Sequence, residues 1–229
     1  MSAHTAPRPR GRRRLWRLAA VAALAAVAAT AAIIASSSHG EPAAPRTPDR
    51  SLFAGIPERA GVLGSPSAPV AVTEYLDLQC PVCAESARSQ LPGLVRDYVR
   101  TGKVRLQARP LQFIGPDSQR AARLAAGAER QGRLWPFIDA FYAAQGTENS
   151  GYVTDDFVRS VSRAAGVDAD KALAAANGAF AQARLNRANA DAERLGINGT
   201  PTFTVARGAG PVKVVRADQL GAVLAAETA

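Results

Sequence analysis

The sequence contains few of the side chains that usually bind metal ions. Its 229 residues include two cysteines and two histidines. Both histidines, His4 and His39, precede the region in which we expect the folded domain. Because a structural zinc site needs four cysteine or histidine ligands, a complete zinc site built from a single chain is nearly excluded.

The two cysteines, Cys80 and Cys83, form a pair with the spacing CxxC. An apolar stretch leads into the pair, and a helix is predicted to begin there. This motif is typical either of half a zinc site or of a redox-active dithiol. The lack of further ligands favours the redox-active dithiol. The residues alone also leave open a zinc ion shared within a dimer, a Cu(I) ion held by two thiolates, and a buried structural pair.

The position of the pair favours redox chemistry for a physical reason. Cys80 stands where the N-cap of the helix is expected, and Pro81 suits the first helical position. Free backbone N–H groups and the helix dipole stabilise a thiolate there, so we expect Cys80 to be the accessible thiol with the lower pKa. Cys83 lies one turn further on, close enough to close a disulfide with Cys80, and we expect it to be buried.

Acidic residues are absent from the first 17 residues, which contain six arginines. Residues 18–35 follow as an uncharged, alanine-rich apolar run, about 27 Å long as a helix and close to the thickness of a bilayer core. We expect residues 1–17 to be a cytoplasmic basic arm and residues 18–35 to be a transmembrane anchor that places the rest of the chain outside. The segment Ala29-Thr30-Ala31 resembles a signal-peptidase site, so a cleaved signal peptide is the alternative.

Outside this basic arm the charge of the chain is nearly balanced. The formal net charge is +9, and the six arginines of the arm account for most of it. A nucleic-acid partner is therefore not expected. Residues 36–51 are rich in serine, proline and charge and are predicted to be a flexible linker. Residues 52–229 are long enough for one domain with its own core.

The pattern within this domain mixes strands and helices. We expect a short strand or a hairpin over 52–67, a strand over 70–78, a helix over 81–100 kinked at Pro92, and a strand over 104–111 parallel to the strand over 70–78. Residues 117–195 are predicted to be helical, with N-caps at Asp117 or Ser118, at Thr154 and at Asp168. An antiparallel hairpin over 202–205 and 212–215 and a helix over 217–228 complete the chain.

Glu74 is an acid on the apolar face of the strand over 70–78. Two interpretations are open from the pattern. In the first, Glu74 is a carboxylate at an edge or on the surface. In the second it is buried, which raises its pKa and positions it to relay protons to the nearby thiols.

Two segments resemble the DsbA-like family of thiol–disulfide oxidoreductases, of the membrane-anchored, exported bacterial type. They are VTEYLDLQCPVC (72–83) and GINGTPTFTV (196–205), separated by a helical segment of the size found in that family. The resemblance covers about residue 55 to the end. It implies an α/β thioredoxin fold with an inserted helical subdomain at about 117–195.

The resemblance also implies roles for individual residues. Cys80 would be the attacking thiol and Cys83 the resolving thiol. Thr200 and Pro201 match the family's cis-proline turn, which faces the cysteines and pairs with the bound peptide, and Glu74 matches the family's buried acid. The strongest oxidants of the family carry histidine where this chain has Val82, so we expect a milder oxidant.

The expected function is disulfide formation in exported proteins through the Cys80 and Cys83 pair. The resemblance implies a membrane redox partner that reoxidises the pair, and neither a cofactor nor a metal ion is expected. A disulfide reductase or isomerase is the alternative within this class. A Cu(I)-binding or peptide-binding chaperone is the alternative from a different class.

Overall fold

The structure is a computed structural model that describes residues 47–49 and 51–229. The expected basic arm (1–17), membrane anchor (18–35) and most of the linker (36–51) lie outside the described residues. Within the described part of the chain, no helix is both long and apolar enough to cross a membrane.

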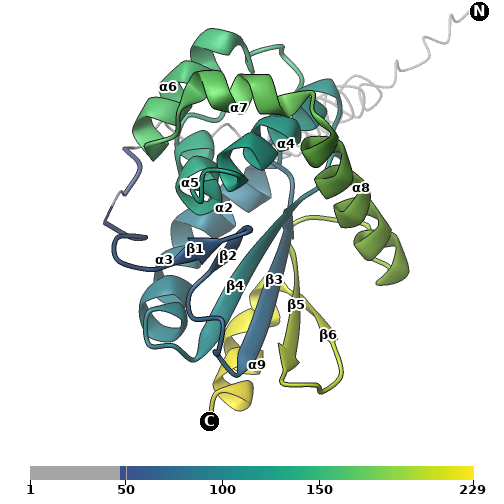
Figure 1. Cartoon of the computed structure of the whole chain (residues 1–229). Coiled ribbons are helices and arrows are strands. Elements are labelled where there is room, and N and C mark those ends of the chain that lie inside the picture. Colours follow the sequence, from purple (N-terminus) through teal and green to yellow (C-terminus); the bar gives the residue numbers. More distant parts are fainter. Residues whose placement is uncertain (1–46, 50) are drawn as a thin grey trace, which may run out of the picture. The chain divides into compact units, whose positions relative to one another are not determined.

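The described residues form one six-stranded sheet with the strand order β1-β2-β4-β3-β5-β6 (Figure 1). Of the strand or hairpin expected over 52–67, the structure has a hairpin, the antiparallel pair β1 and β2. The strands are β1 Glu58–Arg59, β2 Val62–Leu63, β3 Val70–Leu76, β4 Val104–Pro110, β5 Thr202–Arg207 and β6 Lys213–Arg216.

The central strand β3 lies between a parallel and an antiparallel neighbour. It pairs antiparallel with β5. Its parallel pairing with β4 and the antiparallel pairing of β5 with β6 are as the sequence predicts. The carboxyl ends of β3 and β4 therefore lie at the same edge of the sheet. Because β5 runs the opposite way, its first residues lie at that edge too, and the segments that follow β3 and precede β5 meet there.

The segment predicted as one kinked helix over 81–100 is helical, with a break at Gln90, two residues before Pro92. The structure has α2 over Pro81–Ser89, α3 over Leu91–Leu94 and a π-helical turn over Val95–Val99. Pro92 lacks the N–H donor that a continuous helix would use, and its ring crowds the preceding turn, so the break at Gln90 falls within that turn. The buried side chains of Leu91, Leu94 and Val95 continue the apolar face across the interruption.

Five helices form the expected insertion between β4 and β5. Figure 1 shows them gathered at one end of the sheet, in the colours from teal to green. Thr154 and Asp168 are N-caps as predicted, since each side chain accepts a hydrogen bond from a backbone N–H of the first turn. The five helices are α4 Pro116–Glu129, α5 Leu134–Ala143, α6 Asp155–Ala165, α7 Ala169–Ala176 and α8 Ala179–Arg194.

The predicted N-cap at Asp117 or Ser118 is wrong. The helix α4 begins one residue earlier, at Pro116, and its N-cap is Gly115. The Asp117 carboxylate instead accepts a hydrogen bond from the N–H of Gly151, and the Ser118 hydroxyl donates to Asp77. Both side chains bind the helix to other segments of the fold, and the local sequence does not show that these contacts will form.

The hydrophobic core lies between the sheet and the helices that pack against it. Val70, Val72 and Leu76 of β3 are almost completely buried, as the period-two pattern predicts. The aromatic cluster of α5 is also buried, with Phe137 and Phe141 packed ring against ring. The chain ends with a 3₁₀ turn over Ala217–Gln219 and α9 over Leu220–Glu227, which packs against β5 and β6. This arrangement is the thioredoxin fold with a helical insertion.

Candidate active site

The two cysteines lie at the edge where β3 ends and α2 begins. Cys80 is the N-cap of α2 and Pro81 is its first residue, so both expected positions are confirmed. The two thiols are free. Cys83 is completely buried and Cys80 is 8% exposed, so Cys80 is the more accessible of the two but is covered more than expected.

The pKa of the Cys80 thiol is lowered from 9.0 to about 6. The largest cause is a hydrogen bond from the Cys83 thiol, which burial of Cys80 partly offsets. A hydrogen bond from the Thr200 side chain and the backbone N–H groups of Val82 and Cys83 lower the pKa further. These N–H groups belong to the first turn of α2, which is where a helix stabilises negative charge.

The pKa of the Cys83 thiol moves in the opposite direction. Burial raises it well above 9.0, and the hydrogen bond to Cys80 together with the charge of the Cys80 thiolate raises it further. Near neutral pH the pair therefore holds one negative charge, on Cys80, and one proton, on Cys83. Such a pair consists of a reactive thiolate and a protected thiol.

Thr200, which precedes Pro201, lies against Cys80, although 120 residues separate the two in the sequence. The carbonyl oxygen of Thr200 is 3.5 Å from Cys80 Sγ, and the bond between Thr200 and Pro201 is cis. The sheet explains this proximity, since Thr202 at the start of β5 pairs with Tyr75 near the end of β3. The turn before β5 is thus held beside the loop after β3.

Glu74 is buried in the central strand, with 4% of its surface exposed. Its register partners are Ala108 on β4 and Phe203 on β5, so both sides of the strand are covered and the interpretation as an edge or surface carboxylate is wrong. Burial raises the pKa of Glu74 from 4.5 to about 8. No described residue forms a hydrogen bond to its carboxyl group, which agrees with a group that is mostly protonated at neutral pH. The proton relay stays a prediction.

Val82 occupies the position between Pro81 and Cys83 and is 61% exposed. Its side chain is apolar and open to solvent, so it adds no charge to the thiolate of Cys80. Phe113, in the loop between β4 and α4, is a second exposed apolar side chain near this edge, with 48% of its surface exposed.

The last turn of α5 and the residue Gln145 just after that helix support the loop between β3 and α2, which the sequence does not predict. The Gln145 amide donates to the carbonyls of Leu78 (2.8 Å) and Cys80 (3.3 Å), and the Tyr142 hydroxyl donates to the carbonyl of Asp77 (3.1 Å). Burial raises the pKa of Tyr142, and so do the charges of Cys83 and Glu74, which places all three groups within electrostatic range. The sequence signal for this role is weak, because Tyr142 belongs to a run of aromatic and apolar side chains that is typical of core packing.

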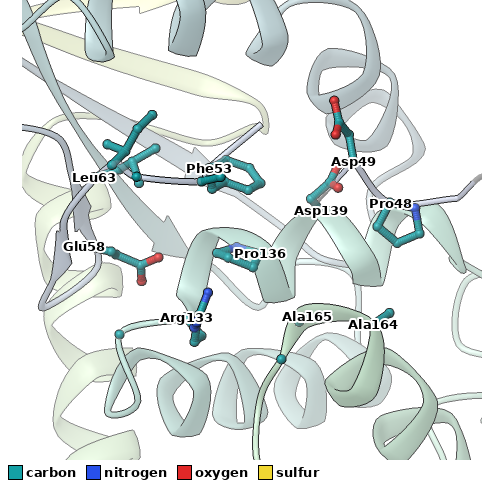
Figure 2. Close-up of a pocket in the computed structure, with 15 residues that line it drawn as sticks. Pro48, Asp49, Phe53, Glu58, Leu63, Arg133, Pro136, Asp139, Ala164 and Ala165 are labelled. Atoms are coloured by element: carbon teal, nitrogen blue, oxygen red, sulfur yellow. The ribbon is translucent and has the colours of Figure 1, made fainter. Parts of the chain in front are cut away.

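The structure also contains a pocket of about 630 Å³ that includes neither cysteine. Pro136 and Asp139 of α5 are among the residues that line it (Figure 2). Tyr142, near the C-terminal end of α5, instead donates a hydrogen bond to the carbonyl of Asp77 in the loop before Cys80. Glu58 lines this pocket and accepts hydrogen bonds from the N–H groups of Leu134 (2.6 Å) and Trp135 (3.3 Å). Burial raises the pKa of Glu58 to about 7.

Metal ligands are sparse in the part of the chain that the structure describes. No group of three or more histidine, cysteine, aspartate or glutamate side chains lies close enough there to hold a metal ion. The geometry at Cys80 and Cys83 is that of a dithiol with one activated member. An arrangement of this kind can exchange a disulfide with a second thiol.

Comparisons with known proteins agree with this geometry. Residues 58–209 match the sequence model of the thioredoxin family. The "Probable disulfide bond formation protein D" of Bacillus cereus is 28% identical over 147 residues, which are 62% of this chain and 68% of that protein.

Two solved structures are similar to this chain over most of its length. A thioredoxin-like oxidoreductase from Silicibacter pomeroyi is 31% identical and covers 79% of this chain and 99% of its own, with a TM-score of 0.57. BdbD from Bacillus subtilis covers 82% of this chain and 99% of its own, with a TM-score of 0.65. BdbD is 19% identical to this chain, so that likeness shows a shared fold.

Proposed function

This chain belongs to the thioredoxin family, and we propose that it is a thiol–disulfide oxidoreductase that forms disulfide bonds in exported proteins. The observation that carries the proposal is that the pKa values of the two thiols are shifted in opposite directions. The pKa of Cys80 falls to about 6 while burial raises that of Cys83. A pair that only packed in the core would have no reason to separate its two pKa values in this way.

The reaction begins with the oxidised form, in which Cys80 and Cys83 are joined. A substrate thiolate attacks Cys80 Sγ, a new sulfur–sulfur bond forms, and Cys83 leaves and takes up a proton. A second substrate thiolate then attacks the substrate sulfur of this mixed disulfide, and Cys80 leaves as a thiolate. The substrate loses two electrons and the enzyme dithiol gains them. The low pKa of Cys80 makes it the better leaving group of the pair.

The same pKa sets the expected oxidising strength. A thiol with a pKa of about 6 is mostly a thiolate near neutral pH, which stabilises the reduced enzyme relative to an ordinary dithiol. Since Val82 beside the pair is open to solvent, screening limits the gain to about 1 kcal/mol, equivalent to roughly 20 mV for a two-electron couple. We therefore propose a mild oxidant rather than one of the strongest of its family.

Other residues at this edge support the reaction. A hydrogen bond to the Thr200 side chain lowers the pKa of Cys80, and the Thr200 carbonyl, which accepts a hydrogen bond from Cys80 Sγ, lies beside the sulfur to which a substrate would be joined. Glu74 is mostly protonated at neutral pH, so we propose that it supplies or accepts a proton when Cys83 changes its charge. Pro81 begins α2 without a backbone N–H donor, which leaves the donors of the next residues directed at Cys80.

We further propose that residues 18–35 anchor the protein in the cell membrane with the catalytic domain outside. A membrane redox partner would then return the dithiol to its disulfide form. A reporter enzyme that works only outside the cytoplasm should be active when it is fused to the C-terminus. A reporter that works only in the cytoplasm should be inactive there. Mature protein that begins near Ala32 and is released into the medium would instead indicate a cleaved signal peptide.

The function can be tested by trapping. Cys83→Ala should accumulate mixed disulfides with substrate proteins through Cys80, because the resolving thiol is missing. Cys80→Ala is the matched control and should trap none, since Cys83 is completely buried. An insulin-reduction assay and a Cu(I) titration of the wild-type protein separate the alternatives. Tight Cu(I) binding without any exchange activity would replace the proposal by a metal-binding function.

A further inference from the structure

Asp77 carries a charged side chain in a completely buried position, three residues before Cys80. One carboxylate oxygen accepts hydrogen bonds from the Gln79 N–H (2.8 Å) and the Ser118 hydroxyl (2.7 Å). The other accepts from the N–H groups of Phe113 (2.8 Å) and Ile114 (3.2 Å). No arginine or lysine in the described part of the chain forms an ion pair with it, so these neutral donors alone offset its burial.

Three of these four donors come from segments that are distant from Asp77 in the sequence. Gln79 belongs to the loop that carries the cysteines, Phe113 and Ile114 to the loop between β4 and α4, and Ser118 to the first turn of α4. The carboxylate of Asp77 therefore joins the thioredoxin core to the helical insertion at the edge where the thiols lie. A buried group that makes this many hydrogen bonds holds its partners in one arrangement.

The backbone of Asp77 contacts the dithiol itself. Its carbonyl accepts hydrogen bonds from the N–H of Cys80 (3.0 Å) and from the Tyr142 hydroxyl (3.1 Å). Burial raises the pKa of Cys83, and a hydrogen bond from the N–H of Asp77 acts against this rise. The side chain of Asp77 thus fixes a residue whose two backbone groups touch both cysteines.

We propose that Asp77 is a positioning residue for thiol exchange, whose carboxylate ties the loop that ends at Cys80, and with it the start of α2, to the start of α4. This inference rests on the proposed function and extends it to the geometry of the thiol pair. With the loop tied, the N–H groups of the first turn of α2 stay directed at Cys80. With the loop released, these donors drift and the thiolate loses part of its stabilisation.

The charge of Asp77 and its position have opposite effects on Cys80, and this allows a clear test. A negative charge near a thiol disfavours the thiolate, so removal of the charge alone would lower the pKa of Cys80. Removal of the positioning contacts would raise it. Asp77→Asn removes both the charge and part of the contacts. Its amide keeps one acceptor oxygen, but an NH₂ group replaces the other oxygen and cannot accept the hydrogen bonds that this oxygen accepted.

The experiment measures the alkylation rate of Cys80 against pH in the full chain, for the wild type and for Asp77→Asn. We expect the pKa of Cys80 to rise by about one unit, which slows alkylation near pH 6 by about fivefold. An unchanged or lowered pKa in a folded variant would overturn the proposal. Alkylation needs no substrate protein, so this result is independent of whether the wild type oxidises or reduces its substrates.

A pair of milder variants covers the case in which Asp77→Asn does not fold. Ser118→Ala removes one donor to the carboxylate and leaves the charge in place. Ser162→Ala is the matched control, since Ser162 is also a completely buried helical serine but its hydroxyl has no hydrogen-bond partner among the described residues. We expect Ser118→Ala to raise the pKa of Cys80 and Ser162→Ala to leave it unchanged. Equal pKa values in the two variants would refute the positioning role.

Discussion

Glu74→Gln tests the consequence of burying an acid in the central strand. The glutamine side chain has nearly the same shape as protonated glutamate but carries no charge at any pH. In the wild type, burial raises the pKa of Glu74 from 4.5 to about 8. The native state therefore binds a proton that the unfolded chain has already released in this pH window, and the two proteins should differ in how their stability depends on pH.

The sign and the size of this effect follow from the two pKa values. The contribution of Glu74 is most favourable below pH 4.5, falls as pH rises through the window from 4.5 to about 8, and is constant above it. Each pH unit in the window corresponds to about 1.4 kcal/mol, so the wild type should lose about 3 kcal/mol between pH 4.5 and pH 7 through this group. Glu74→Gln should lose none of this.

Urea denaturation under a reductant provides the measurement. The free energy of unfolding is determined for both proteins at several pH values in the window, and the difference between them is plotted against pH. Other titrating groups, including Glu58 and Cys80, are common to both proteins and cancel in the difference. A difference that stays constant within about 0.5 kcal/mol across the window would show that Glu74 does not keep its proton on folding.

Two further predictions concern the groups around the thiolate. Thr200→Val removes the hydroxyl that donates to Cys80 and should raise the pKa of Cys80 by roughly half a unit to one unit, as measured by alkylation against pH; an unchanged pKa would mean that the hydroxyl does not stabilise the thiolate. Val82→His places a cation beside the pair and should lower the pKa of Cys80 by about one unit at acidic pH and make the protein more oxidising in a glutathione equilibrium. Val82→Gln is its neutral control, and an equal change in potential in both variants would exclude the charge as the cause.

Much of the fold could be predicted because local patterns and global packing agree. The alternation of Val70, Val72 and Leu76 predicts a strand with one buried face, and the structure has it. The order of strand, helix and strand predicts the parallel pair of β3 and β4. Cys80 and Pro81 predict the start of α2, because N-cap and first-turn preferences depend on the immediate neighbours alone.

The parts that were missed depend on contacts between distant segments. Asp117 and Ser118 have the composition of an N-cap, but their side chains bind Gly151 and Asp77 across the fold. Asp77 itself is one of two acids, with Glu74, within an otherwise apolar segment, and its four donors come from three different segments. The sequence shows that such a residue is unusual for its surroundings, but it does not show which donors will surround it.

The acidity of Cys80 shows why a CxxC motif alone does not fix the chemistry of its thiols. The residue between the motif's proline and its second cysteine is Val82, which is exposed and uncharged, yet the pKa of Cys80 still falls to about 6. The largest cause is Cys83 within the motif, but the next contribution that lowers the pKa comes from Thr200, at the other end of the domain sequence. Thr200 reaches Cys80 because β5 pairs with β3, so the register of the sheet is itself a determinant of thiol acidity. A slip of one residue in that register would turn Thr200 away from the sulfur, and the motif would then keep its spacing but lose part of its reactivity.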